Sequence, residues 1–149
     1  MNLEGRTIGI ALTGSHCTIP EILPIVDGLV EAGAAVTAIM SVSVSTTDTR
    51  FGKAQDIREH LEKVTGNWII DTIAKAEPIG PKRMFDCLVV APCTGNTLAK
   101  LALGITDTPV TMAAKAHLRN GRPLVIGVST NDGLAGSAAN IGTLLCKKN

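Results

Sequence analysis

The sequence contains very few aromatic residues. Tyrosine is absent, and the aromatic side chains are Phe51, Trp68 and Phe85. Stacking between aromatic rings is a common way to hold a planar ligand. This chain could not sandwich such a ligand between its own aromatic side chains. A planar ligand would have to rest on backbone and aliphatic groups, or against a neighbouring protomer.

The chain also lacks a strong excess of charge and long hydrophobic runs. Its formal net charge is +1 over 149 residues, and no basic stripe alternates with aromatic residues, which argues against a nucleic-acid-binding protein. No run is long enough to span a membrane, and the first residues lack the pattern of a signal peptide. We therefore expect the protein to act in the cytoplasm.

Cysteine is present but has no metal-site or disulfide pattern. The four cysteines are Cys17, Cys87, Cys93 and Cys146, with no Cys-x-x-Cys pair and no histidines at ligand spacing, so we expect no metal site. We interpret Cys87 and Cys146 as small buried hydrophobic residues. Cys17 and Cys93 lie in loops, where an exposed, reactive thiol is the alternative to a structural role. His117 is expected on a helix surface.

What the sequence does contain is a regular alternation of apolar strands with amphipathic helices. Strands are predicted at 8–12, 35–40, 87–91 and 124–128. Helices are predicted near 20–32, with Pro24 as an alternative start, and at 54–64, 68–76, 98–103, 110–118 and 134–145. The pattern predicts one three-layer, Rossmann-like α/β domain over 1–149, an open parallel sheet with helices on both faces.

The last residues and the overall composition suggest two further features. The basic end at 147–149 is abrupt for a doubly wound domain, so we expect a C-terminal strand and helix to be missing. The hydrophobic content of 45% is high for a small monomer, which favours a homo-oligomer or a complex with a partner chain.

Hydroxyl-rich loops follow all four predicted strands. In a parallel sheet these loops share one edge, where ligands of such folds bind, and a helix start there suits a phosphate. Helix capping is the simpler alternative for some of these side chains. The residues predicted to bind a cofactor are Thr13, Gly14, Ser15, Ser41, Ser43, Thr94, Gly95, Asn96 and Thr97.

The loop sequences also bear on the type of cofactor. The loop after the first strand is not Gly-x-Gly-x-x-Gly, and the second strand ends in Met40-Ser41 rather than an acidic residue, which argues against a standard NAD site. NADP stays open, since Arg50 or the serines could meet its 2′-phosphate. The loops suit a single phosphate with a flavin ring better, so FMN is the predicted cofactor.

Two sets of motifs resemble known proteins. The segment 92–100, Pro-Cys-Thr-Gly-Asn-Thr-Leu-Ala-Lys, resembles the motif of the flavoprotein family that includes the homo-oligomeric flavin-containing cysteine decarboxylases and the flavin prenyltransferases. Thr13-Gly14-Ser15 is similar to the first phosphate loop of that family. Within the family, segments 12–18, 48–52, 75–82 and 129–132 resemble the B subunits of dipicolinate synthases.

This resemblance implies a function. The B subunits take part, during sporulation, in oxidising a dihydrodipicolinate-pathway intermediate to dipicolinate, together with a partner, the A subunit, which carries the nicotinamide cofactor NADP. The resemblance also implies a homo-oligomer, a trimer or a dodecamer. Asn96 is the catalytic candidate that would orient substrate or flavin. Arg50, Ser129 and Asn131 are the candidates for binding the dicarboxylate substrate.

Two departures from the family pattern leave alternatives open. The decarboxylases carry a histidine where Ala76 stands, and Ser129 lies where they have a substrate motif and the prenyltransferases an arginine. These departures argue against decarboxylation and prenyl transfer. A non-catalytic partner for the A subunit is the main alternative to an oxidoreductase component, and an independent flavin-dependent decarboxylase is the other.

Overall fold

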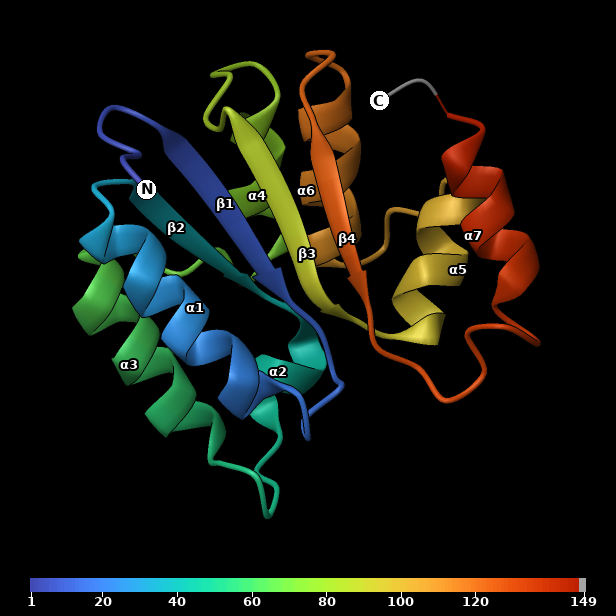
Figure 1. The fold of residues 1–149 in the computed structure, drawn as a ribbon, viewed down its shortest axis with the longest axis horizontal. Helices are drawn as coiled ribbons and strands as arrows, with labels where there is room; N and C mark the ends of the chain where they lie inside the picture. The colour runs from blue at the N-terminus through green and yellow to red at the C-terminus, as the bar shows by residue number, and fades with distance from the viewer. Residues whose placement is uncertain (148–149) are drawn as a thin grey trace.

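Four parallel strands form the centre of the molecule (Figure 1). The structure is a computed structural model that describes residues 1–147. The strands are β1 (Thr7–Leu12), β2 (Ala35–Met40), β3 (Cys87–Cys93) and β4 (Leu124–Val128). Their order is β2-β1-β3-β4. Because the chain runs from β1 to β2 on one side and reaches β3 on the other, the carboxyl ends of β1 and β3 form a topological switch point.

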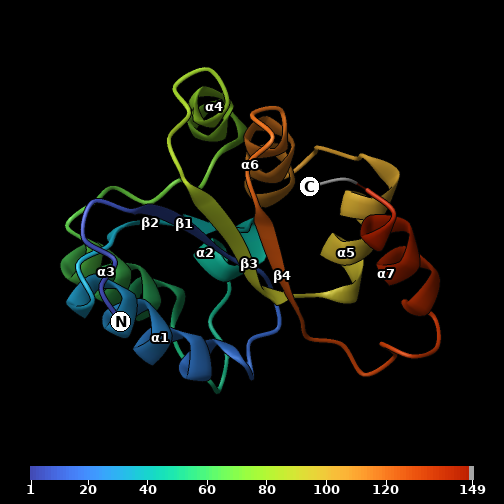
Figure 2. The same ribbon diagram turned by 45° about the horizontal axis from the view of Figure 1, so that its top comes forward.

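Helices cover both faces of the sheet, as predicted (Figure 2). One face carries α1 (Ile19–Glu31) and α3 (Ala54–Thr65), and the other carries α4 (Ile73–Ala76) and α6 (Pro109–Leu118). The remaining helical segments are α2 (Val42–Thr46), the short 3₁₀ helix Glu77–Ile79, α5 (Gly95–Leu103) and α7 (Ala138–Leu145). Helices α5 and α7 pack against each other beyond β4 rather than over the sheet.

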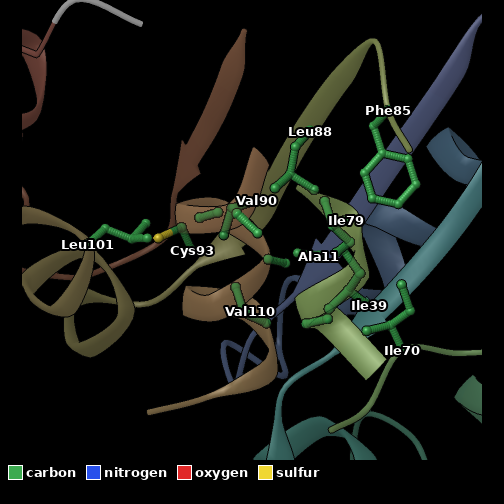
Figure 3. Packing of buried hydrophobic residues seen from close by; sticks show 14 of the residues in the cluster. Ala11, Ile39, Ile70, Ile79, Phe85, Leu88, Val90, Cys93, Leu101 and Val110 are labelled. Carbon is green, nitrogen blue, oxygen red and sulfur yellow. The ribbon is translucent and has the colours of Figure 1, made fainter. Parts of the chain in front are cut away.

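The alternation of side chains along the strands produces two hydrophobic clusters, one on each face. Ile10 and Leu12 of β1 lie in the cluster beneath α1 and α3, together with Val26 of α1. Ala11, between them in the sequence, faces the other cluster, where it lies with Val90 (Figure 3). The sheet is therefore buried on both faces over β1 and β3, as expected for parallel strands.

Helix α1 begins at Ile19, with Pro20 in its first turn, so the alternative start at Pro24 is wrong. Proline is tolerated in a first turn, but Pro24 inside the helix removes one backbone hydrogen bond. The helix continues because its apolar face packs on the sheet, with Val26 fully buried and Ile22 and Leu29 against the same cluster. Tertiary packing outweighs the lost bond.

Segment 68–72 is not helical, contrary to the prediction of a helix over 68–76. Ile70 forms a parallel bridge to Ile39, and its N–H and C=O bond Ala38 and Met40 of β2 at 3.0 and 2.9 Å. The outer edge of β2 offers these backbone partners, and the bridge buries Ile70. A short apolar run cannot distinguish between helix and strand by periodicity alone.

Other boundaries also differ from the prediction, among them the start of α5, at Gly95 rather than 98, and the end of β3, at Cys93 rather than 91. The final helix begins at Ala138 rather than at 134, because the backbone before it folds into turns about Asp132. The hydroxyl-rich stretch after β2 contains the short helix α2, which Ser41 caps by accepting a hydrogen bond from Val44 N–H at 3.3 Å. The single domain over 1–149 stays an expectation, and Lys148 and Asn149 lie outside the described residues.

Candidate functional site

The loops after β1 and β4 meet at the carboxyl edge of the sheet. The hydroxyl of Ser129, directly after β4, lies 2.7 Å from that of Ser15 and 2.9 Å from that of Thr18. The Ser15 and Thr18 hydroxyls are 3.2 Å apart. We call these three residues the hydroxyl triad. Since β3 separates β1 from β4, the triad bridges the end of β3, where a ligand of such a fold would lie.

Thr13 ties the loop after β1 to the end of β3. Its buried hydroxyl donates to the Pro92 carbonyl at 2.6 Å and accepts from Thr94 N–H at 2.9 Å. Pro92 follows a cis peptide bond after Ala91. The Thr13 side chain, predicted to bind cofactor, uses its hydroxyl within the fold and so positions Thr94 at the edge.

The start of α5 combines a helix cap with exposed polar groups. Thr94 caps α5, because its hydroxyl accepts from Thr97 N–H at 3.2 Å. The capping alternative therefore holds for Thr94, and Thr97 is buried beside it. Asn96, in the first turn, has an exposed side chain, and the structure records no hydrogen bond for it among the described residues. Asn96 is thus available to an incoming ligand.

The loop after β2 joins the same edge. His16 Nε2 lies 3.1 Å from the Ser43 hydroxyl. A Cβ atom at Gly14 would lie 2.9 Å from that hydroxyl, so a side chain there would require Ser43 to shift. The Nδ1 atom of His16 is buried without a hydrogen-bond partner among residues 1–147. This edge therefore holds an unsatisfied polar atom beside a tight glycine loop.

The structure does not bring every predicted residue into this group. Arg50 is exposed on the turn between α2 and α3, where its guanidinium stacks 4.8 Å from the centre of the Phe51 ring. Asn131 is exposed after β4, and no hydrogen bond of its side chain is recorded within 1–147. Neither residue contacts the hydroxyl triad through a recorded interaction. The expectation that Arg50 and Asn131 contact the substrate therefore depends only on their positions in the loops after β2 and β4.

Sequence reasoning missed a second polar group on the β4 loop. Asp132 accepts hydrogen bonds from the hydroxyls of Thr130 and Ser137 at 2.5 and 3.0 Å, and these bonds lower the pKa of its carboxyl group. A Cβ atom at Gly95 would lie 3.2 Å from the Thr130 hydroxyl and 3.3 Å from that of Ser137. Asp132 thus holds together the β4 loop, which lies close to the first residue of α5. The Ser-Thr-Asn-Asp sequence was the available signal.

The cysteines and His117 differ in part from expectation. Cys93 is fully buried, and burial raises the pKa of its thiol to about 12, which excludes the reactive alternative for this residue. Cys17 is exposed beside the hydroxyl triad, whereas Cys146, expected to be buried, is exposed at the end of α7. His117 is buried instead of lying on a helix surface, and its Nε2 atom bonds the Pro123 carbonyl at 2.9 Å.

Comparison with known proteins shows the family of the chain. The family model described as Flavoprotein matches residues 1–134. The chain belongs to the Flavoprotein family. Among curated relatives, this flavoprotein is 48% identical over 148 residues to the dipicolinate synthase B subunit of Bacillus subtilis (strain 168), a match that covers 99% of this chain and 74% of the relative.

Two solved structures superpose on this flavoprotein. The B subunit of dipicolinate synthase from Bacillus halodurans superposes with a TM-score of 0.89 at 49% identity, covering 100% of this chain and 76% of that one. A dodecameric FMN-dependent UbiX-like decarboxylase from Escherichia coli O157:H7 superposes with a TM-score of 0.75 at 24% identity, covering 93% and 75% of the two chains. The second comparison shows a shared fold.

Two other classes of feature are missing from the described part of this flavoprotein. Within residues 1–147, none of the helices has both the length and the apolar character needed to cross a membrane. Over the same residues, histidine, cysteine and acidic side chains do not gather in threes as they would around a metal ion.

Proposed function

We propose that this flavoprotein is the B subunit of a dipicolinate synthase, with a flavin site at the carboxyl edge of the sheet. The hydroxyl triad is the observation that carries the proposal, because it joins side chains from the β1 and β4 loops at the switch point. The high identity to two dipicolinate synthase B subunits supports the assignment to that reaction.

The residues at this edge fit the phosphate of FMN. Ser15, Thr18 and Ser129 supply hydroxyl donors that bond each other in the structure and can turn toward an oxyanion. Thr18 also precedes α1, a helix of 13 residues whose positive end favours negative charge. Gly14 lies close to Ser43, so the β1 and β2 loops are near each other here. The site therefore suits a compact anion held by neutral donors.

The triad also changes the role proposed for Ser129. The resemblance implied that Ser129 contacts substrate, but its hydroxyl lies between those of Ser15 and Thr18. We therefore assign Ser129 to the phosphate. Asn131, two residues further along the loop, and Arg50 are kept as the groups that would meet the carboxylates of the substrate, since a guanidinium matches a carboxylate well.

The start of α5 would hold the flavin ring. Thr94, Gly95, Asn96 and Thr97 lie there, and the exposed Asn96 amide can donate to and accept from the ring edge or the substrate. A bound flavin supplies the capacity to accept two electrons as a hydride from a partly reduced substrate ring. The partner A subunit, which would hold NADP, would supply the final electron acceptor, and Asn96 would orient the substrate ring at the flavin site.

Ala76 gives a structural reason against the decarboxylase alternative. The family's histidine would stand at this position, yet Ala76 is fully buried in α4 and lies in the core cluster with Ile79. The methyl group of alanine has no nitrogen that could act as an acid or a base, so this position cannot supply the proton chemistry of a histidine. The scaffold alternative predicts instead that the chain supports the A subunit without binding flavin. We also propose that this flavoprotein forms a homo-oligomer, as the solved dodecameric decarboxylase does.

The test is reconstitution of dipicolinate formation from the purified A and B subunits. We expect product only when both proteins, FMN and NADP are present. Asn96→Ala should lower the rate by at least tenfold, on the order of one lost hydrogen bond to the reacting groups. Asn140→Ala, in α7, is the matched control and should keep the rate.

Two results would overturn this assignment. Full activity of the Asn96→Ala variant would remove Asn96 from the site. Equal activity with and without FMN, in protein shown to be free of flavin, would favour the scaffold alternative.

A further inference from the structure

The imidazole of His16 joins two loops at the carboxyl edge of the sheet. Its Nε2 atom lies 3.1 Å from the hydroxyl of Ser43 in α2, a helix that lies beside the loop after β1 (Figure 1). Its Nδ1 atom is buried and has no hydrogen-bond partner among residues 1–147. Over the same residues no carboxylate is recorded in a hydrogen bond with this ring, whereas Asp27 contacts His60 at 2.8 Å.

These surroundings determine which ring nitrogen of His16 carries the hydrogen. A neutral imidazole has one N–H group, and a buried N–H without an acceptor is rarer in proteins than a buried acceptor without a donor. A hydrogen on Nδ1 would be buried without an acceptor within residues 1–147. A doubly protonated ring would have the same unpaired N–H and would bury a charge as well. The hydrogen therefore belongs on Nε2, which donates it to the Ser43 oxygen.

The direction of this bond leaves the hydrogen of the Ser43 hydroxyl free. A hydroxyl has one hydrogen to donate, and within residues 1–147 the Ser43 hydroxyl is recorded in no bond other than that with His16. Because Ser43 is exposed, this hydrogen can point toward a ligand. A hydrogen on Nε2 also excludes His16 as a base toward this hydroxyl, since a base would need a lone pair on that nitrogen.

The Ser43 hydroxyl lies next to the loop that carries two members of the hydroxyl triad. A Cβ atom at Gly14 would lie 2.9 Å from the Ser43 oxygen and 3.9 Å from His16 Nε2. Gly14 immediately precedes Ser15, whose hydroxyl bonds that of Ser129. Ser43 therefore reaches this loop from the side of β2, whereas Ser129 reaches it from the side of β4.

We propose that His16 is a positioning residue that makes the Ser43 hydroxyl a fixed donor to the phosphate of the bound cofactor. This inference rests on the proposed FMN site, and it adds a phosphate contact on the side of β2. A hydrogen bond to a charged phosphate oxygen is stronger than one between neutral groups. The imidazole acts through the serine and does not itself contact the ligand.

Nuclear magnetic resonance tests the first step without any ligand. Long-range ¹H–¹⁵N spectra distinguish the two nitrogens of each histidine ring, and His16→Gln identifies the signals of His16 by their loss. At about pH 8, where an imidazole of ordinary pKa is neutral, we expect the hydrogen of His16 on Nε2. A hydrogen on Nδ1 would overturn the proposal, because His16 could then not donate to Ser43.

Titrations with FMN and with riboflavin, which lacks the phosphate, test the second step. Ser43→Ala should weaken FMN binding by about tenfold and leave riboflavin binding unchanged. His16→Asn, whose shorter amide does not reach Ser43, should weaken FMN binding by about three- to tenfold. His16→Gln should bind FMN within about twofold of the unsubstituted protein, since its amide nitrogen takes the place of Nε2. Ser45→Ala, also in α2, is the control, because the Ser45 hydroxyl donates to the Val42 carbonyl at 3.0 Å.

Failure of this proposal can be told apart from failure of the proposed function. Absence of FMN binding by the unsubstituted protein would overturn both. FMN binding that weakens in Ser15→Ala but not in Ser43→Ala would overturn only the role of His16 and Ser43. An equal loss of FMN and riboflavin binding in Ser43→Ala, or a loss in His16→Gln as large as in His16→Asn, would also overturn that role. The circular dichroism spectrum of each variant establishes that it is folded before binding is compared.

Discussion

Single hydroxyl groups decide much of the geometry at the carboxyl edge. Thr13 uses its one oxygen both to donate to Pro92 and to accept from Thr94, which fixes the end of β3 relative to β1. The Ser15, Thr18 and Ser129 hydroxyls bond each other across loops more than 110 positions apart in the sequence. The Thr13 hydroxyl serves the fold, whereas the three hydroxyls of the triad can turn toward a ligand. Threonine occurs in both roles, so the residue type alone does not tell a structural hydroxyl from one that is available to a ligand.

A buried histidine gives the residue-scale prediction. Burial lowers the pKa of His117 below its usual value of 6.5, although the Pro123 carbonyl opposes the shift. Between the lowered pKa and 6.5 the unfolded chain binds a proton that the folded chain does not. The free energy of unfolding should therefore fall as the pH drops from about 7 through 6.5.

Urea unfolding at several pH values measures this dependence. His117→Gln keeps a side-chain donor for the Pro123 carbonyl but cannot take up the proton, so its stability should change less over the same range. An identical slope in the two proteins would show that His117 does not carry the effect.

At the scale of elements, close backbone approach explains where glycine is required. A Cβ atom at Gly9, in β1, would lie 2.7 Å from the Phe85 ring and 2.8 Å from Leu88 Cδ1. Phe85 and Leu88 are both buried, so neither side chain can move away easily. A Cβ atom at Gly142, in α7, would meet no described atom within 4 Å apart from its chain neighbours and the backbone of its own helix.

These two glycines form a matched pair for a stability test. Gly9→Ala should destabilise the protein by about 1–3 kcal/mol through overpacking. Gly142→Ala should be neutral or stabilise it by up to about 1 kcal/mol, because alanine favours a helix. Thermal unfolding monitored by circular dichroism gives both values. A Gly9→Ala variant as stable as the unsubstituted protein would show that the β1–Phe85 contact is looser than described.

The same elements show what the sequence could reveal. Strands β2 and β4 were predicted with their observed limits, because a short apolar run between turn residues has few alternatives in an alternating pattern. Segment 68–72 was predicted wrongly because its pairing partner, the edge of β2, lies about 30 positions away. The helix predicted at 98–103 begins at Gly95, where Thr94 caps it. The turn about Asp132 was not predicted, because it depends on side-chain bonds that local patterns do not reveal.

For the whole molecule, topology explains why the site residues meet. The parallel strand order places all four hydroxyl-rich loops on one edge, and this gathering was predicted from the sequence and is confirmed. The particular pairing of Ser129 with Ser15 and Thr18 was not predicted, since it depends on how two loops cross the end of β3. Arg50 lies on the turn between α2 and α3, apart from the recorded contacts of the triad, so its role in binding substrate stays a prediction.

The central claim is that the carboxyl edge binds FMN, and a titration followed by quenching of FMN fluorescence tests it most directly. We predict saturable binding by the purified protein. Ser15→Ala and Thr18→Ala should each weaken it by roughly 10- to 100-fold, the effect of losing a hydrogen bond to a charged group of about 1.5–3 kcal/mol. Thr143→Ala, a matched exposed threonine on α7, should bind as the unsubstituted protein does. A folded protein that fails to quench FMN, or triad variants that bind as tightly as the control, would contradict the account.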